Sequence, residues 1–533
     1  LWIELETIPL TSNGKIDKQA LPSPADSDLS NKVYVAPSTT IEKQLVRIWQ
    51  ELLEVEKIGI YDNFFELGGH SLLAVQLISR LQKIGYYIEV KDIFSTPSIT
   101  SIASKLSLES NVTTVPENGI TLSTTHITPS MLPLVELNQE EINSIVGTIP
   151  GGISNIQDIY PLSPLQEGIY FQHMMSSSDQ GDSYILSNLI SFSTPTKRDD
   201  FIDALSFIIS RHDTLRTCII SKELPLPVQV VLREVSLIPE ILDLKDTDNT
   251  LEELKSLVAP GGQWLDVSQA PLIQIKIADD QVNNCYYLII NLHHLITDHV
   301  GLEKIVSEVF VYLSGDKKSL STPVLYRDFI SHTLQQQLVN DSESHFKSLL
   351  GTIKSPTYPF ELSNIQINAK NIEEHRRVLP NRLSKTLRDT STKLGLSPAV
   401  FFHAAYGLVV GQCSNSEYTI FGSLFSGRLQ GAIGSEDSLG LFINTLPVYL
   451  ELKGTVSEYL FQVQQCLNDL LPFEQTPLSH IQDWSGIAND MAFFSALLNY
   501  RHSSILGGEN QEKIFEDLGM SVIAGQERTN YPF

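Results

Sequence analysis

The sequence predicts a multidomain protein in which a small all-α four-helix bundle precedes a much larger α/β region. Three observations support this prediction. The chain has 533 residues, which exceeds one ordinary core and suggests about three or four domains. Residues 38–106 repeat apolar side chains at helical spacing, as in Ile41, Leu45 and Leu52. From about residue 155 onward, helical patterns alternate with strand-like apolar runs.

The elements of the bundle follow from caps and turn residues. Thr39 and Glu42 have the spacing of a capping box, which predicts the start of the first helix. A loop with two glycines leads into a second helix that begins at Ser71. A short turn near 93–94 precedes a last helix over 99–106.

The larger region follows a segment of different composition. Residues 108–135 are rich in Ser, Thr and Pro, and we expect an interdomain linker there. A short helix follows, begun by a capping box of Asn138 and Glu141. The α/β region beyond it is large enough for two subdomains. Its predicted helices are 199–210, 397–411 and 457–470, and its predicted strands are 186–192, 286–292, 418–424 and 446–452.

Composition argues against several classes of protein. The net charge of −25 repels phosphates, so we expect no nucleic-acid partner. The four cysteines are far apart and form no C-x-x-C pair, which indicates reduced thiols in a cytoplasmic protein. The longest apolar run, 399–411, is too short to span a bilayer, so we expect no membrane segment. The first residue is Leu1, and we expect an internal fragment of a larger protein. We also expect a monomer.

Ser71 begins the second helix in the string "DNFFELGGHSLLAVQL". By itself this serine is an ordinary helix cap. The core "LGGHSL" (67–72), however, closely resembles the attachment motif of peptidyl carrier proteins. The resemblance implies that Ser71 carries covalent 4′-phosphopantetheine, attached by a phosphopantetheinyl transferase. It covers residues 38–107, the expected carrier domain.

A second resemblance lies at the start of the chain, where "NGKIDKQALP" is similar to the last motif of adenylation domains. Residues 1–24 are therefore expected to be the C-terminal end of an adenylation domain, with Lys15 as its motif lysine. An upstream adenylation domain is the partner that this resemblance implies.

A histidine pair follows the apolar run 286–292. His293 and His294 leave this predicted strand, and Asp298 lies four residues after His294. Imidazole exchanges protons near neutral pH, but the spacing alone favours a hydrogen-bonded core pair. No third ligand lies nearby in the sequence, so no metal site is expected.

The string "HHLITDHVG" resembles the H-H-x-x-x-D-G motif of nonribosomal peptide synthetase condensation domains, with His299 in place of the motif glycine. Other motifs of that family occur in the family's order, and they place the domain at 136–533 with its C-terminal end apparently missing. They are "SPLQEGIYF" (163–171), "RHDTLRT" (211–217), "YRDF" (326–329), "GLFINTLP" (440–447), "LPFEQTPLSHIQ" (471–482) and "FSALLNYRHS" (494–503).

The resemblance implies a chloramphenicol-acetyltransferase-like fold of two subdomains in a V with a tunnel between them. It implies that His294, beside His293, assists attack of an acceptor amine on the donor thioester. The acceptor would arrive on a downstream carrier domain. Asp298 is expected to be structural, and we hypothesise that it pairs with Arg428 of the other subdomain.

One subclass of these domains first epimerises the donor Cα, and its extra motif reads roughly H-H-(I/L)-x-x-x-x-G-D. Here His173 and Gly181-Asp182 remain, Gln172 replaces the first histidine, and the spacing is two residues longer. His173 is therefore a further catalytic candidate, and dual epimerisation and condensation is the favoured interpretation. Condensation without epimerisation, a degenerate docking domain and an acyltransferase that uses free acyl-coenzyme A remain alternatives.

Overall fold

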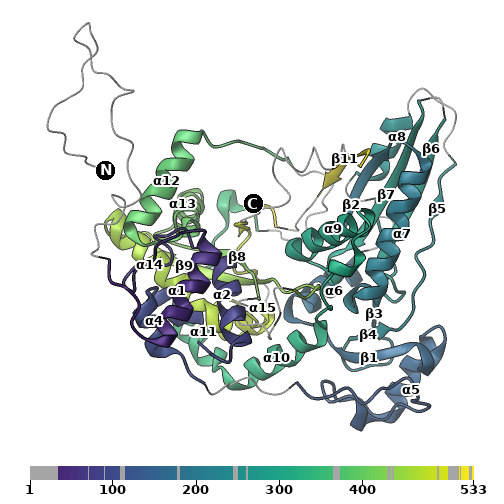
Figure 1. Cartoon of the computed structure of the whole chain (residues 1–533), viewed down its shortest axis with the longest axis horizontal. Coiled ribbons are helices and arrows are strands. Elements are labelled where there is room, and N and C mark those ends of the chain that lie inside the picture. The colour runs from purple at the N-terminus through teal and green to yellow at the C-terminus, as the bar shows by residue number, and fades with distance from the viewer. Residues whose placement is uncertain are drawn as a thin grey trace, which may run out of the picture.

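The computed structural model describes residues 34–533 apart from several gaps, and everything below refers to the described residues. Figure 1 shows the small helical bundle against one of two larger α/β parts that diverge like the arms of a V. The predicted adenylation segment 1–24, with Lys15, lies outside the described residues. The gaps are 70, 89, 109–114, 177–180, 244–249, 260–261, 282, 354, 364–372, 429–433, 435–436, 489–490, 502–514, 516–517 and 527–530.

The bundle contains four helices, in agreement with the predicted four-helix fold class. The capping box of Thr39 and Glu42 is present at the start of the first helix. Trp49 and Phe64 form the centre of its core, with ring centroids 5.0 Å apart. The turn expected near 93–94 is a short helix instead. The helices are α1 (Thr40–Leu53), α2 (Ser71–Lys83), α3 (Val90–Ser95) and α4 (Ile99–Lys105).

The N-terminal subdomain holds two sheets, one of three strands in the order β1-β4-β3 and one of five in the order β11-β2-β7-β6-β5. Helices α7 and α9 pack against each other over the larger sheet. Its strands are β1 (Ile156–Pro161), β2 (Ile185–Phe192), β3 (Thr217–Ile220), β4 (Val228–Leu232), β5 (Glu240–Ile241), β6 (Ile273–Asp280), β7 (Cys285–His293) and β11 (Met520–Gln526), and its helices are α5 (Gln139–Thr148), α6 (Pro164–Met175), α7 (Pro195–Arg211), α8 (Thr250–Leu257) and α9 (His299–Leu313).

The C-terminal subdomain is built on a three-stranded sheet in the order β10-β8-β9. Helices α13 and α14 pack against that sheet and against each other. Its strands are β8 (Tyr418–Phe425), β9 (Asn444–Glu451) and β10 (Leu497–Leu498), and its helices, with the connecting α10, are α10 (Tyr326–Val339), α11 (Ser342–Leu350), α12 (Asn381–Leu394), α13 (Pro398–Cys413), α14 (Val456–Leu470) and α15 (Leu478–Trp484).

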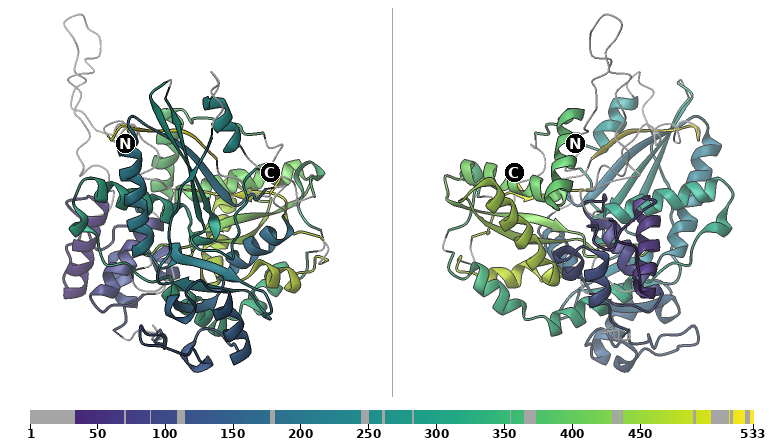
Figure 2. Two further views of the ribbon diagram at one scale, coloured as in Figure 1. Left: turned by 90° about the vertical axis from the view of Figure 1, so that its right-hand side faces the viewer. Right: turned by 60° about the vertical axis from the view of Figure 1, so that its left-hand side comes forward.

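Two segments cross between the subdomains. Strand β11 comes from the end of the chain and pairs antiparallel with β2 of the N-terminal subdomain. The loop before β9 buries Leu439 and Leu441 in the N-terminal core. Figure 2 shows β11 (yellow) reaching across to the larger sheet in two further views. The two subdomains are therefore joined by packing as well as by covalent connections.

The bundle is packed against the C-terminal subdomain. Its helix α3 contacts α14 and the 3₁₀ turn η9 (Leu471–Phe473). Buried side chains of the bundle, such as Ile93, belong to one apolar cluster with side chains of the C-terminal subdomain. The burial of apolar surface stabilises this position of the bundle.

The segment expected as a linker contributes apolar side chains to the N-terminal subdomain. Ile120, Ile127 and Leu132 are buried in a cluster with residues of α5 and of the β1-β4-β3 sheet. The composition of the segment does not indicate this packing. Serine, threonine and proline dominate the segment, so its few buried isoleucines carry little weight in a composition average.

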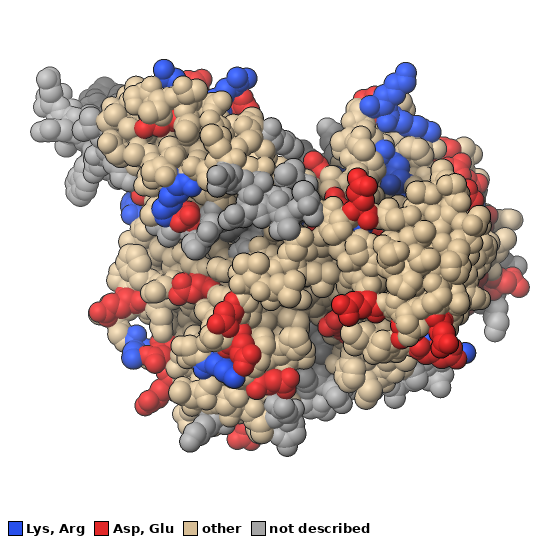
Figure 3. All heavy atoms as spheres, turned by 90° about the horizontal axis from the view of Figure 1, so that it is seen from below, with Lys and Arg blue, Asp and Glu red and all other residues tan. Residues whose placement is uncertain are grey.

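Acidic side chains outnumber basic ones on the surface, as the net charge of the sequence leads one to expect (Figure 3). Figure 3 shows carboxylate side chains spread over both halves of one face, with fewer basic side chains between them. The four cysteines are unpaired. Among the described residues no single helix meets the length and hydropathy of a membrane span; α12 and α13 do so only as a pair bent by 109°.

Candidate active site

The histidine pair lies where β7 ends at the centre of the molecule. His293 is the last residue of β7, and His294 begins the 3₁₀ turn η5 (His294–Ile296). The strand is held on both sides, since β2 pairs with residues 286–293 and β6 pairs with residues 285–292. The backbone N–H of His294 also donates to the carbonyl of Tyr184 at 2.9 Å. Both imidazoles therefore start from a rigid backbone.

The hydrogen bonds of His294 define which ring nitrogen carries the proton. Its Nδ1 lies 3.3 Å from the carbonyl oxygen of Thr297. A carbonyl can only accept, so Nδ1 carries the hydrogen and Nε2 is the basic nitrogen of the neutral ring. The side chain is largely buried, with 9% of its surface exposed. This tautomer is the one that a general base at Nε2 requires.

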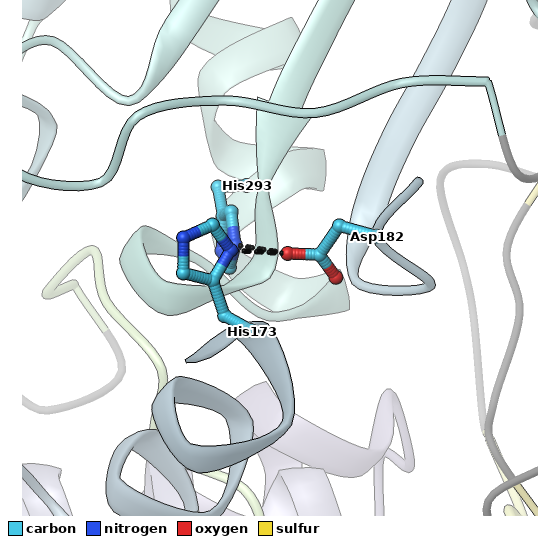
Figure 4. Close-up of side chains that lie close together, drawn as sticks. All are labelled: His173, Asp182 and His293. Atoms are coloured by element: carbon cyan, nitrogen blue, oxygen red, sulfur yellow. Dashed lines mark hydrogen bonds and ion pairs between the residues drawn. The ribbon is translucent and has the colours of Figure 1, made fainter. Parts of the chain in front are cut away.

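His293 has the opposite tautomer. Its Nδ1 accepts the backbone N–H of Leu295 at 3.1 Å, and its Nε2 donates to Asp182 Oδ2 at 3.0 Å. Asp182 also accepts from Nδ1 of His173 at 2.7 Å and from the backbone N–H of Tyr184. Figure 4 shows the two imidazoles converging on the one carboxylate from α6 and from the end of β7.

Hydrogen bonds from the two imidazoles keep the carboxylate of Asp182 ionised. Burial raises the pKa of Asp182, but the hydrogen bonds from His173 and His293 outweigh burial and hold that pKa well below its usual value. Burial lowers the pKa of His293 despite the neighbouring carboxylate. His173 is also stacked on Trp264, with ring centroids 5.4 Å apart. His293 and His173 therefore hold a fixed arrangement around Asp182.

Two possible metal ligands that are distant from the histidine pair in the sequence lie beside His293 in the structure. His173, Asp182 and His293 place possible ligand atoms within 4.8 Å of one another. Asp182 is 111 residues before His293 in the chain, and only the β2–β7 pairing brings it close. The hydrogen bonds argue against a cation there, because protons occupy the two nitrogens that face Asp182.

Asp298 joins the histidine turn to the other subdomain. It caps α9 by accepting the N–H of Gly301 at 2.8 Å. Its carboxylate accepts from Arg428 Nη2 at 3.0 and 3.1 Å and from the N–H of Phe442 at 3.2 Å. The hypothesised pairing of Asp298 with Arg428 is confirmed. Both side chains are buried, as expected of a structural ion pair.

His299, in place of the family's glycine, does not distort this loop. It is the first residue of α9, and its backbone is not in the left-handed region that favours glycine. Its Nε2 lies 3.1 Å from a carboxylate oxygen of Glu303, and its Nδ1 lies 3.4 Å from Nη1 of Arg501. The bonds of Asp298 to Gly301 and Arg428 are formed beside it.

The carrier loop before Ser71 requires glycine. Gly68 has φ +100°, and a Cβ at Gly69 would lie 2.3 Å from the ring of Phe64 and 2.6 Å from its carbonyl oxygen. Ser71 is the first residue of α2; the position of its side chain lies outside what the structure describes. The glycines let the chain turn tightly against Phe64 immediately before the helix that begins at Ser71.

One cavity of about 350 Å³ brings the carrier loop and the histidine turn together. Gly68 and Gly69 line it from the bundle, His294 and Asp298 from the N-terminal subdomain, and Phe425 from the C-terminal one. Its other apolar lining includes Leu396, Leu424 and Ile443. The described lining of this cavity does not include His173, Asp182 or His293. The structure thus brings His294 to the cavity and His173 to His293.

The comparisons with known proteins now identify the family. The profile of the condensation domain matches residues 156–533, and that of the phosphopantetheine attachment site matches residues 43–106. The chain belongs to the condensation-domain family, with a carrier domain before it, and both domains are homologous to parts of nonribosomal peptide synthetases. A condensation domain is a peptide-bond-forming acyltransferase, and the carrier domain implies covalently attached 4′-phosphopantetheine.

Two relatives align with all or most of this chain. Malpibaldin synthetase of Mortierella alpina is 38% identical over 100% of this chain, and surfactin synthase subunit 2 of Bacillus subtilis (strain 168) is 25% identical over 92%. The chain spans only 10% and 13% of the lengths of these proteins. The condensation domain of the monacolin K polyketide synthase has a similar fold, with a TM-score of 0.53 at 15% identity over 71% of this chain and 88% of that one.

Proposed function

We propose that this chain forms a peptide bond between a donor held on its own carrier domain and an acceptor amine brought by a downstream carrier. The supporting observation is the shared cavity, which is lined by the Gly68–Gly69 loop before Ser71 and by His294. Attached to Ser71, 4′-phosphopantetheine supplies the donor acyl group as a thioester. The lining of the cavity is mostly apolar, which disfavours the water that would hydrolyse this thioester.

His294 is the proposed general base. With Nδ1–H directed to the carbonyl of Thr297, its Nε2 accepts a proton from the acceptor amine as the nitrogen attacks the thioester carbonyl carbon. The C–N bond forms, the C–S bond breaks, and the proton is passed to the leaving sulfur. Such assistance contributes about 10²–10⁴ in rate. Holding both reactants in one cavity contributes as well.

The partners follow from this role. We propose an upstream adenylation domain, whose end occupies 1–24, then a carrier at 38–107, a connection at 108–135 and a condensation domain from 136 onward. A phosphopantetheinyl transferase modifies Ser71. The remaining expectations, a cytoplasmic monomer without nucleic-acid or membrane partners, belong to the same proposal.

The test loads Ser71 with an L-aminoacyl-pantetheine and supplies a small aminoacyl-thioester acceptor, with the dipeptide measured by mass spectrometry. His294→Ala should lower the rate about 10²- to 10⁴-fold. His480→Ala is the matched control, because His480 is exposed on α15. Dipeptide formation at the unchanged rate in His294→Ala would refute the role of His294.

A second proposed activity is epimerisation of the donor Cα before condensation. The buried cluster of His173, Asp182 and His293 favours it, since these residues of the partial motif are held together beside the turn that carries His294. We propose that His294 exchanges the Cα proton. His173 then acts as a positioning residue, because it contacts His293's partner and does not line the described cavity.

Reaction in D₂O tests this second activity. Deuterium at the donor Cα together with a D-residue in the product is the expected result. His173→Ala should lose Cα exchange while it still forms the dipeptide. Equal loss of both reactions would show that His173 only supports the fold, and a product without deuterium in the unaltered chain would rule out epimerisation.

A further inference from the structure

The α12 wall of the cavity carries two polar groups that peptide-bond formation does not use. Arg388 and Ser391 lie one helical turn apart on α12, and both line the cavity. Ser391 is 3% exposed, and its Oγ has no hydrogen-bond partner among the described residues. Buried hydroxyls are nearly always hydrogen-bonded. An unpartnered hydroxyl in a cavity wall therefore indicates that a polar group of a ligand occupies this place.

Arg388 supplies a positive charge at the same wall. It is exposed, and it forms no hydrogen bond or ion pair with another described side chain. The other two cavity arginines differ, since Arg428 pairs with Asp298 and Arg501 contacts His299. Tyr500 lines the same cavity, and the charge of Arg388 opposes the rise that burial causes in the pKa of Tyr500.

The carrier loop meets the end of the same helix. Gly395 caps α12 with φ +64°, and a Cβ at that position would lie 3.2 Å from Nδ2 of Asn63 in the carrier loop. Oδ1 of Asn63 accepts the backbone N–H groups of Phe65 and Glu66, so this loop has a defined shape. The same loop continues through Gly69 to Ser71. The glycines of this loop, Gly68 and Gly69, line the same cavity as α12.

The chemistry of the two groups matches the arm that the carrier domain implies. The arm begins with a phosphodiester, which is anionic, and continues through amides. Arginine is the preferred partner of phosphate oxygens because its planar fork donates two parallel hydrogen bonds. A serine hydroxyl can pair with an amide carbonyl or N–H. In a chain with a net charge of −25, an unpaired arginine at this place is a specific feature.

We propose that Arg388 binds the phosphodiester of the arm on Ser71 and that the Ser391 hydroxyl bonds an amide of the same arm. The two residues form a track along α12 that directs the arm toward His294. This inference rests on the proposed function, because it assumes that Ser71 delivers its donor into this cavity.

The test measures binding of the free arm to the full chain with Ser71→Ala, which prevents covalent attachment. The probes are 4′-phosphopantetheine and pantetheine, which differ only in the phosphate, and their affinities are measured by ligand-observed NMR. The phosphorylated probe should bind about two- to fivefold more tightly, as expected for an exposed charged pair. Added salt should reduce that preference.

Arg388→Gln should abolish the preference for phosphate and leave pantetheine binding unchanged. Arg382→Gln is the matched control, since Arg382 is exposed on the same helix outside the described cavity lining. The proposal is overturned if Arg388→Gln and Arg382→Gln behave alike, or if neither probe is preferred by the parent chain.

Ser391→Ala separates ligand binding from a structural role. Removal of an unpartnered hydroxyl should leave the melting temperature unchanged or raise it, because no hydrogen bond of the fold is lost. Affinity for both probes should fall about two- to tenfold. A lower melting temperature with unchanged affinity would show that the hydroxyl serves the fold.

The dipeptide assay distinguishes failure of arm binding at α12 from failure of the condensation function. If the unaltered chain forms the dipeptide but Arg388→Gln keeps its phosphate preference, the arm-binding role is wrong and the condensation function stands. If the chain binds the phosphorylated probe through Arg388 but forms no dipeptide, the condensation function is wrong and the binding site stands.

Discussion

Replacing Arg428 by alanine removes the charged group that joins the crossing loop to the start of α9. The guanidinium has three kinds of contact in the structure. It donates to both carboxylate oxygens of Asp298, it donates to the carbonyl of Ser438 at 2.9 Å, and it lies 3.8 Å from the ring centroid of Phe442. The substitution loses all of these contacts and leaves Asp298 buried without its cation.

The size of the effect follows from burial. Arg428 and Asp298 have only 2% and 1% of their side chains exposed, and removal of one partner from a buried pair costs about 3–5 kcal/mol. Two donors to Asp298 remain, the N–H groups of Gly301 and Phe442. They compensate part of the charge, so the lower value, about 3 kcal/mol, is expected. For a domain that spans residues 156–533, that corresponds to a fall of about 4 °C in the melting temperature, at about 2.1 cal/mol/K of unfolding entropy per residue.

Thermal unfolding followed by circular dichroism measures this shift. Lys347→Ala is the control, because Lys347 pairs with Glu343 on an exposed surface of α11, where both side chains are more than half exposed. An exposed pair contributes at most about 1 kcal/mol. A melting temperature for Arg428→Ala within about 1 °C of that of the control would refute the reasoning that this pair holds the subdomains together.

Burial raises the pKa of Asp213 to about 6. In this pH range the folded protein therefore binds more protons at Asp213 than the unfolded chain does. The free energy of unfolding should fall by up to about 3 kcal/mol as the pH rises from about 4 to about 6. Asp213→Asn should lose this slope in urea-unfolding midpoints, and an unchanged slope would contradict the assignment. Gly69→Ala should lower the melting temperature of the carrier and its modification by a phosphopantetheinyl transferase, because the new Cβ meets the Phe64 backbone; unchanged modification would show that the loop adapts. His299→Gly should destabilise α9 by up to about 1 kcal/mol, whereas greater stability would show that His299 strains the loop.

Local structure was predictable because its determinants are close in the chain. The capping box of Thr39 and Glu42 starts α1, and that of Asn138 and Glu141 starts α5, as their spacing predicts. The strand predicted at 286–292 is β7, one residue longer at each end. A cap or an apolar alternation involves contacts within a few residues, so a single sequence records them directly.

A contact between distant segments was predictable only where both contacting residues belong to sequence motifs of the family. The pairing of Asp298 with Arg428 is such a case. The cluster around Asp182 was recognised only in part, since the motif contains His173 but gives no sign that His293 completes it. Ser391 was not found at all, because a serine within a polar helix is an ordinary residue until its surroundings are known.

The sequence by itself determined the carrier loop, the helix that begins at Ser71, and the strand that ends in the histidine pair. These features depend on backbone conformation and on hydrophobic periodicity, which neighbouring residues set. Only the tertiary structure decided which histidine reaches the cavity, and that α12 forms its wall beside the carrier loop. Those relations depend on how the bundle packs against the C-terminal subdomain and how β2 pairs with β7. Burial of apolar surface and long-range strand pairing specify them, and neither is encoded in any short stretch of the chain.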